Sequence, residues 1–125
     1  MRPTYVNVTI HGKHTKQIKM LVNTGSTYIV LPPQTIEKLG LIKTPYTIEL
    51  TPAHKRKIKA KLHLAQAEIK GRKGPALIAE ADTPVPLLGA HALETLGFKA
   101  NPLTGQLEEI SPEGGYLLYT TNKNQ

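Results

Sequence analysis

The residues most able to do chemistry lie in one short stretch, Asn23-Thr24-Gly25-Ser26, which directly follows the apolar run Met20-Leu21-Val22. Taken alone, Asn-Thr-Gly is a good turn tripeptide. The amide of Asn23 can donate and accept hydrogen bonds, but it cannot take up a proton as a carboxylate does. On residue type alone, the stretch therefore predicts a turn rather than a catalytic group.

Other sets of reactive residues are poorly represented. The absence of cysteine excludes a disulfide framework, thiolate zinc sites and a cysteine nucleophile. Asp82 is the sole aspartate and precedes Pro84, where a turn or cap role is expected, and no Gly-x-Ser-x-Gly elbow supports a Ser-His-Asp set. His11 and His14 lack carboxylate or thiol neighbours in the sequence, so we expect exposed turn histidines, no metal site and no cofactor.

The elements that must position the turn are short strands. Val6, Val8 and Ile10 alternate with polar residues, which predicts a half-buried strand over residues 4–10. Further strands are expected at 17–22, 28–31, 46–50, 57–64, 66–70, 75–79, 106–110 and 116–120, with turns at 11–14, 71–74 and 101–105. Two short helices are expected, at 34–39 after Pro32-Pro33 and at 90–96 before Gly97. Many short strands with close turns favour a small closed or partly closed β-structure.

One predicted hairpin, at about residues 46–64, has a basic tip. Lys55, Lys57, Lys59 and Lys61 fall on one face of the hairpin, which is most simply a solvated strand face. The formal charge of +7 has the same simple explanation, a lysine-rich surface. The alternative is a basic β-barrel that binds nucleic acid through His54-Lys55-Arg56-Lys57 and Arg72-Lys73. No aromatic residue lies between His54 and Ala79 for base stacking, so we consider nucleic acid an unlikely partner.

Length and hydropathy bound the class of protein. A chain of 125 residues fits one domain, and we expect residues 1–125 to form it. No apolar run approaches about 18 residues, and the first twenty residues alternate instead of forming an apolar block. We therefore expect a soluble cytoplasmic protein without a secretion signal or membrane partner.

The surroundings of the turn change its interpretation. Residues 20–31 resemble the active-site strand and turn of retropepsin-like aspartic proteases, with Asn23 as the only mismatch, at the position of the catalytic aspartate. Leu87-Leu88-Gly89, the helix that follows it and Gly97-Phe98 resemble the second conserved part of that family. The order and spacing match over about residues 4–110. The resemblance implies a mainly β fold, a small closed barrel of the retropepsin type, with the 46–64 hairpin as its flap.

The resemblance also implies a mechanism and an assembly. In such enzymes two carboxylates hold one water, one accepting its proton while the other protonates the peptide carbonyl. This chain offers one turn, so two identical chains would have to meet, placing the site on a two-fold axis. Residues 1–5 and the 116–125 strand and tail would lie in the interface. Gly25 would allow close approach of the two turns, and Thr24 would brace them.

The resemblance further implies which residues meet an extended peptide or unfolded protein substrate. They are Ser26, Thr27, Ala53, His54, Lys55, Leu87 and Leu88. With Asn23 in place of the acid, the aspartic endopeptidase should fold and not cut. We favour an introduced replacement, which would trap substrate or stop self-digestion, over the alternative of a natural peptide-binding pseudoprotease.

Overall fold

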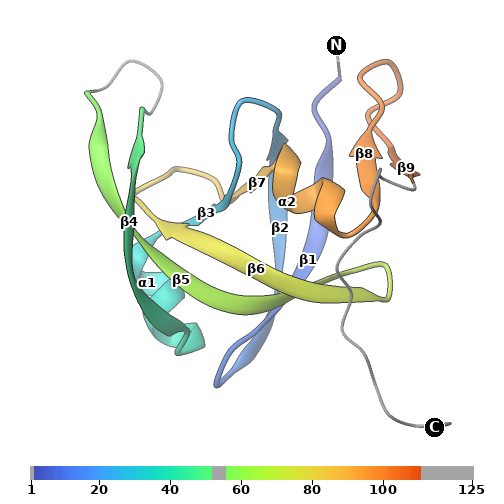
Figure 1. The fold of residues 1–125 in the computed structure, drawn as a ribbon. Coiled ribbons are helices and arrows are strands. Elements are labelled where there is room, and N and C mark those ends of the chain that lie inside the picture. Colours follow the sequence, from blue (N-terminus) through green and yellow to red (C-terminus); the bar gives the residue numbers. More distant parts are fainter. Residues whose placement is uncertain (1, 52–55, 111–125) are drawn as a thin grey trace, which may run out of the picture.

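The fold is that of a computed structural model, which describes residues 2–51 and 56–110. It is mainly β with two short helices. The elements follow in the order β1 (Tyr5–His11), β2 (Thr15–Asn23), β3 (Ile29–Leu31), α1 (Pro33–Leu39), β4 (Ile42–Leu50), β5 (Ile58–Ile69), β6 (Arg72–Glu80), β7 (Leu87–Gly89), α2 (Ala90–Thr95), β8 (Phe98–Ala100) and β9 (Leu107–Glu109) (Figure 1). The predicted strand at 116–120 lies outside the described residues.

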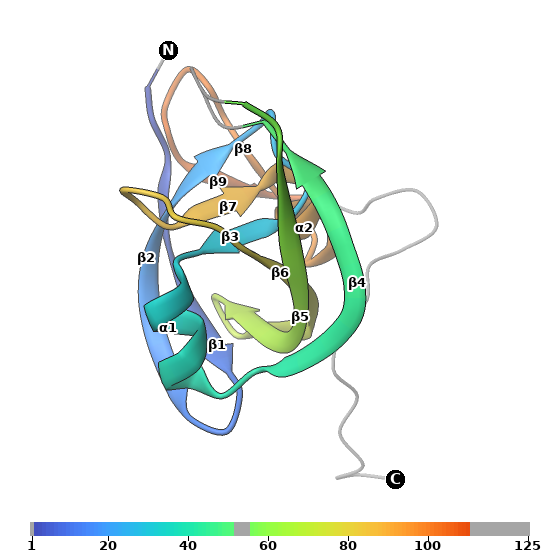
Figure 2. The ribbon, with the colours of Figure 1, turned by 90° about the vertical axis from the view of Figure 1, so that its left-hand side faces the viewer.

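Six strands close into a barrel in the order β1-β2-β7-β3-β6-β5. The closing contact pairs β1 with β5 in antiparallel fashion, with Ile10 opposite Ala67. A closed barrel leaves fewer unpaired strand edges than an open sheet. β4 stands outside the ring and pairs only with β5, so these two strands form a hairpin that continues beyond the barrel (Figure 2). The predicted small closed β-structure is confirmed.

Two groups of buried apolar side chains hold the structure together. The larger fills the barrel and consists of Val6, Val8, Ile10, Ile18, Met20, Ile29, Leu31, Ile36, Leu39, Ala65, Ala67, Ile69, Ile78, Leu88, Leu93, Leu96 and Phe98. The smaller, which we call the hairpin cluster, contains Val30, Ala60, Leu62, Ala79 and Ala81, with Tyr28, Ile48, Leu50 and Leu87 packed against it. The turn between β2 and β3 is therefore flanked by two distinct cores.

β5 contributes to both cores because it changes its buried face along its length. Ala60 and Leu62 belong to the hairpin cluster, whereas Ala65, Ala67 and Ile69 belong to the barrel core. Successive side chains of a strand point to opposite faces, so even-numbered residues are buried first and odd-numbered ones later. The prediction of a solvated lysine face is confirmed for the described residues, since Lys57, Lys59 and Lys61 are exposed.

Several predicted boundaries were wrong. The strands expected at 57–64 and 66–70 are one continuous strand, β5. The turn expected at 71–74 is the two-residue turn Lys70-Gly71, with φ of 48° and 81°. Two consecutive positive φ values match the twist of the flanking strands, so β6 starts directly at Arg72. Strand β8 was not predicted.

The two helices were predicted nearly correctly. Helix α1 starts at Pro33, where the missing N–H of proline costs no hydrogen bond, and Gly40 caps it with φ of 63°. Helix α2 ends at Thr95. Within the described part of the chain, neither helix is long and apolar enough to cross a membrane.

Candidate active site

The candidate site is the turn that follows β2, which ends at Asn23. The Gly25 N–H donates to the Asn23 side-chain oxygen, Oδ1, at 3.0 Å. The Ser26 N–H donates to the Asn23 main-chain carbonyl at 3.1 Å. The side chain at position 23 is therefore not free to rotate, because its oxygen closes the turn that it begins.

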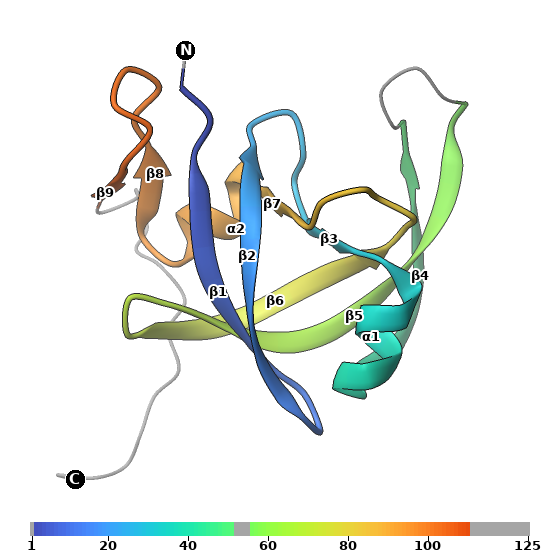
Figure 3. The ribbon, with the colours of Figure 1, turned by 180° about the vertical axis from the view of Figure 1, so that it is seen from behind.

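Strand β7 lies between β2 and β3, the two strands that the turn connects, and supports the turn there (Figure 3). It runs parallel to β2, with Gly89 opposite Asn23, and antiparallel to β3. The Gly89 N–H donates to the Tyr28 carbonyl at 3.0 Å, and the Ala90 N–H donates to the Ser26 carbonyl at 2.9 Å. The C-terminal part of the turn, from Ser26 to Tyr28, is thus bonded to the segment that opens α2.

Gly89 is required by space rather than by its backbone angles. A Cβ atom at this position would lie 2.5 Å from the Thr27 carbonyl carbon and 2.5 Å from the Tyr28 carbonyl oxygen. Both are main-chain atoms, so the crowding could be relieved only by moving the backbone of the turn. The glycine therefore sets how closely β7 approaches the turn.

The turn presents its outer side to solvent. Thr24, Gly25 and Thr27 are exposed and Asn23 is half-buried. The Ser26 hydroxyl is half-buried and donates to the Tyr28 carbonyl at 3.2 Å, so it braces the turn. An amide side chain held in this position can bind polar groups of a ligand, but it cannot accept a proton from water.

The two predicted substrate-binding leucines have different surroundings. Leu87 is half-buried and packs against the hairpin cluster, as Tyr28, Ile48 and Leu50 also do. Leu88 is only 1% exposed and lies in the barrel core, so it supports the turn from inside. The other predicted contacts, Ala53, His54 and Lys55, lie outside the described residues.

A His–Glu pair that joins β5 to β6, with a buried histidine, was not predicted from the sequence. His63 is 6% exposed, and its Nε2 lies 2.9 Å from Glu80 Oε1. Its other ring nitrogen, Nδ1, is buried and has no hydrogen-bond partner among residues 2–51 and 56–110. The pair ties β5 to β6 where β5 changes its buried face. The only signal in the sequence is the alternation of the strand. His63 occupies the next alternate position after Lys57, Lys59 and Lys61, where another lysine would continue the pattern.

The prediction of exposed turn histidines is confirmed for His14 but wrong for His11, which ends β1 and is half-buried. His11 Nε2 lies 2.9 Å from Glu68 Oε1, and His11 Nδ1 lies 3.3 Å from the Thr15 hydroxyl. In residues 2–51 and 56–110, no group of three or more His, Cys, Asp or Glu could hold a metal ion. Arg72 donates to the Leu96 and Gly97 carbonyls, both at 3.1 Å, and its guanidinium lies 4.9 Å from the centre of the Phe98 ring. This arginine anchors the segment after α2, which weakens the nucleic-acid interpretation.

Comparison with models of known protein families finds a match. A family model described as gag-polyprotein putative aspartyl protease matches residues 6–95. The matched region runs from β1 through α2 and includes the turn at Asn23, the β4–β5 hairpin and β7. No curated protein matches the chain.

Proposed function

The chain belongs to the gag-polyprotein aspartyl protease family, and on this basis we propose that two copies of it form an endopeptidase site with Asn23 at each catalytic position. The observation that carries the proposal is the bond from the Gly25 N–H to Asn23 Oδ1, at 3.0 Å. A carboxylate oxygen could take the place of this amide oxygen and accept the same N–H. The turn is therefore already shaped for an acid.

The proposed reaction needs both copies. Two carboxylates close together cannot both ionise, so they share one proton and titrate as a pair. One accepts a proton from the attacking water, and the other protonates the carbonyl oxygen of the peptide bond. Because each chain has one such turn, the complete pair exists only where two turns meet across a two-fold axis.

The hairpin cluster supports an extended peptide as the substrate. Its half-buried apolar side chains come from both sides: Ile48 and Leu50 belong to β4 of the hairpin, whereas Tyr28 follows the Asn23 turn and Leu87 starts β7. Apolar groups that remain partly exposed beside a site can bury apolar side chains of a ligand. We propose that the hairpin covers a bound peptide and that cleavage occurs between apolar residues.

The form with Asn23 should bind peptides without cutting them. The amide keeps the hydrogen bond that closes the turn, so the shape of the site is retained while proton transfer is lost. An introduced replacement and a natural pseudoprotease share this expectation. The residue that the gene encodes at position 23 separates them.

The experiment that tests the proposal is the single substitution Asn23→Asp. We expect it to produce an endopeptidase that is active at acid pH and loses activity as rising pH ionises both carboxylates, because the shared proton is then lost. The measurement is digestion of an unfolded protein from acidic to neutral pH, with and without a statine-type inhibitor. The unchanged chain should show no cleavage at any pH.

Asn23→Ala is the matched control, because it removes the oxygen that closes the turn without supplying an acid. It should remain inactive at every pH. If a folded, dimeric Asn23→Asp protein cuts nothing across the whole range, the endopeptidase proposal fails. Peptide binding by the same protein would then favour a pseudoprotease.

A further inference from the structure

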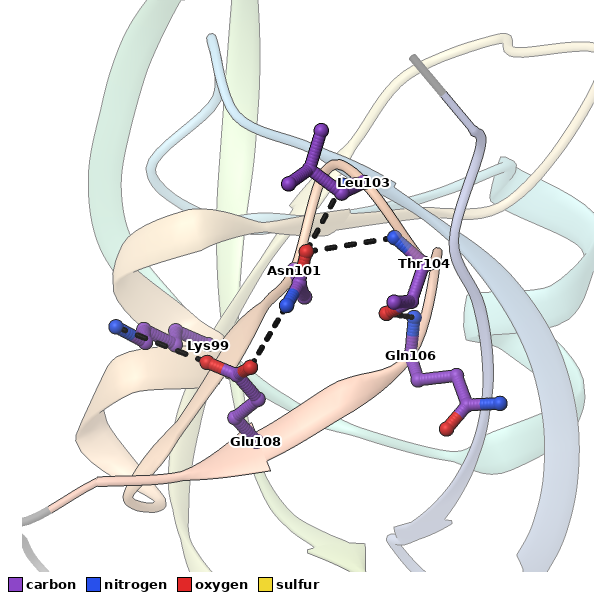
Figure 4. A network of polar contacts seen from close by, with 6 residues as sticks. All are labelled: Lys99, Asn101, Leu103, Thr104, Gln106 and Glu108. Carbon is purple, nitrogen blue, oxygen red and sulfur yellow. Dashed lines mark hydrogen bonds and ion pairs between the residues drawn. The ribbon is translucent and has the colours of Figure 1, made fainter.

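The turn between β8 and β9 is unusually well fixed for a short surface loop (Figure 4). Asn101 Oδ1 accepts the N–H groups of Leu103, at 2.8 Å, and Thr104, at 3.3 Å. Asn101 Nδ2 donates to Glu108 Oε2 at 2.8 Å, and the Gln106 N–H donates to the Thr104 hydroxyl at 3.2 Å. The turn thus has one defined conformation before any partner arrives.

This fixed turn presents an apolar side chain to solvent. Leu103 is 84% exposed, more than any other large apolar residue in the described part of the chain. A single exposed leucine is common on protein surfaces and by itself indicates nothing. A leucine on an ordered turn is a better contact than one on a mobile loop, because binding a partner then costs little conformational entropy of the loop.

The turn is connected to the candidate site through the N-terminal segment. The Arg2 N–H donates to the Pro102 carbonyl at 3.1 Å, and the Val22 N–H, next to Asn23, donates to the Thr4 carbonyl at 2.8 Å. Thr4 is buried, with 5% of its surface exposed. Residues 2–4 therefore bridge the β8–β9 turn to the end of β2.

Figures 1 and 3 show that the Asn23 turn, the N-terminal segment and the β8–β9 turn all project from the same end of the molecule. Helix α1 and the start of β4 lie toward the opposite end. Any second copy that brings its own turn up to Asn23 must approach this end. It would meet the β8–β9 turn as it does so.

We propose that Leu103 and its turn form a contact surface for a second copy of this chain. This inference rests on the proposed function, which requires two turns to meet. In a two-fold interface every contact occurs twice, so one leucine per chain supplies two buried side chains. The β8–β9 turn lies outside the matched residues 6–95, so the family match does not carry this contact.

The test is the substitution Leu103→Asp, with Ile42→Asp as the matched control. Ile42 is also an exposed aliphatic residue, at 66%, but it begins β4 beside the end of α1. Sedimentation over a concentration series should show a dimer for the unchanged chain and for Ile42→Asp. Leu103→Asp should weaken the dimer at least tenfold, because it places two charges in an apolar contact. Its thermal unfolding as a monomer should be unchanged, since the side chain is exposed.

A second variant, Asn101→Ala, keeps the leucine and removes the side chain that orders its turn. It should weaken the dimer by less than Leu103→Asp, because only the ordering of the turn is lost. If Leu103→Asp sediments like Ile42→Asp in a protein that is dimeric, the contact is wrong while the proposed function stands. If the unchanged chain is monomeric at every concentration and Asn23→Asp is inactive, both proposals fall together.

Discussion

At the scale of single residues, the site depends on two positions that make different demands. Asn23 needs an oxygen that can accept the Gly25 N–H, and both an amide and a carboxylate provide it. Gly89 needs the absence of a side chain, because two carbonyl groups occupy the space where a Cβ would lie. Under the proposed function, the residue at position 23 decides whether the site can react, whereas the glycine at position 89 allows the turn to keep its shape.

We predict that Gly89→Ala destabilises the protein by about 1–3 kcal/mol, since the added methyl group must push back the main chain at Thr27 and Tyr28. The measurement is the free energy of unfolding in denaturant. Gly71→Ala is the control. Gly71 has open space around its Cβ position but a φ of 81°, so its substitution should cost about 1 kcal/mol through backbone strain alone. Equal costs for the two changes would contradict the crowding at Gly89.

At the scale of elements, β5 is the strand that joins the barrel to the hairpin. Its buried face changes between Leu62 and Ala65, and His63 lies at that change, tied to Glu80 on β6. A buried imidazole with one unpartnered nitrogen depends strongly on the partner that remains. The carboxylate of Glu80 therefore supports the base of the hairpin.

We predict that Glu80→Ala lowers the free energy of unfolding by about 1–3 kcal/mol, because both nitrogens of His63 would then be buried without partners. The structure supplies a matched control in His11 and Glu68, whose atoms are also 2.9 Å apart but whose side chains are 27% and 32% exposed. Water can replace the carboxylate there, so Glu68→Ala should cost at most about 1 kcal/mol. A smaller loss for Glu80→Ala than for Glu68→Ala would contradict this account.

The elements also show which features of the fold the sequence could predict and why the other features could not be predicted. The two helices and the local hydrogen bond from the Gly25 N–H to Asn23 depend on neighbouring residues, so local patterns were sufficient to predict two helices and a turn. The Lys70-Gly71 turn was misplaced because Gly71 and Gly74 both read as turn residues, and only the backbone shows that positive φ falls on Lys70. The face change in β5 and the His63–Glu80 pair depend on contacts between distant segments, which no local pattern contains.

At the scale of the whole molecule, the sequence predicted a barrel and missed how it closes. The antiparallel pairing of Ile10 with Ala67 joins segments far apart in the chain, and β7 enters between two strands that are close in sequence. The proposed active unit is a dimer, since one chain contributes one turn. Its activity should therefore depend on the number of dimers in which both chains carry an acid at position 23, rather than on the number of chains.

We predict that an excess of the unchanged chain inhibits the Asn23→Asp protein, because mixed dimers contain only one carboxylate and cannot complete the reaction. If subunits exchange freely, a tenfold excess should reduce activity to about a tenth. The assay is digestion of an unfolded protein at acid pH after mixing and incubation. An Asn23 chain that also carries Leu103→Asp is the control and should inhibit much less. Full activity in the presence of the unchanged chain would contradict a shared site.

The position of β7 also sets when the turn can acquire its shape. The N–H groups that bind the carbonyls of the turn belong to Gly89 and Ala90, whereas the turn itself starts at Asn23. A growing chain carries the turn residues long before it carries those partners, and contacts between distant segments form late in folding. A partial chain that stops short of Gly89 can form the local bonds of the turn but lacks its two bonds to Gly89 and Ala90. Under the proposed function, we therefore expect the complete support of the site to form only after residue 90 has been added to the chain.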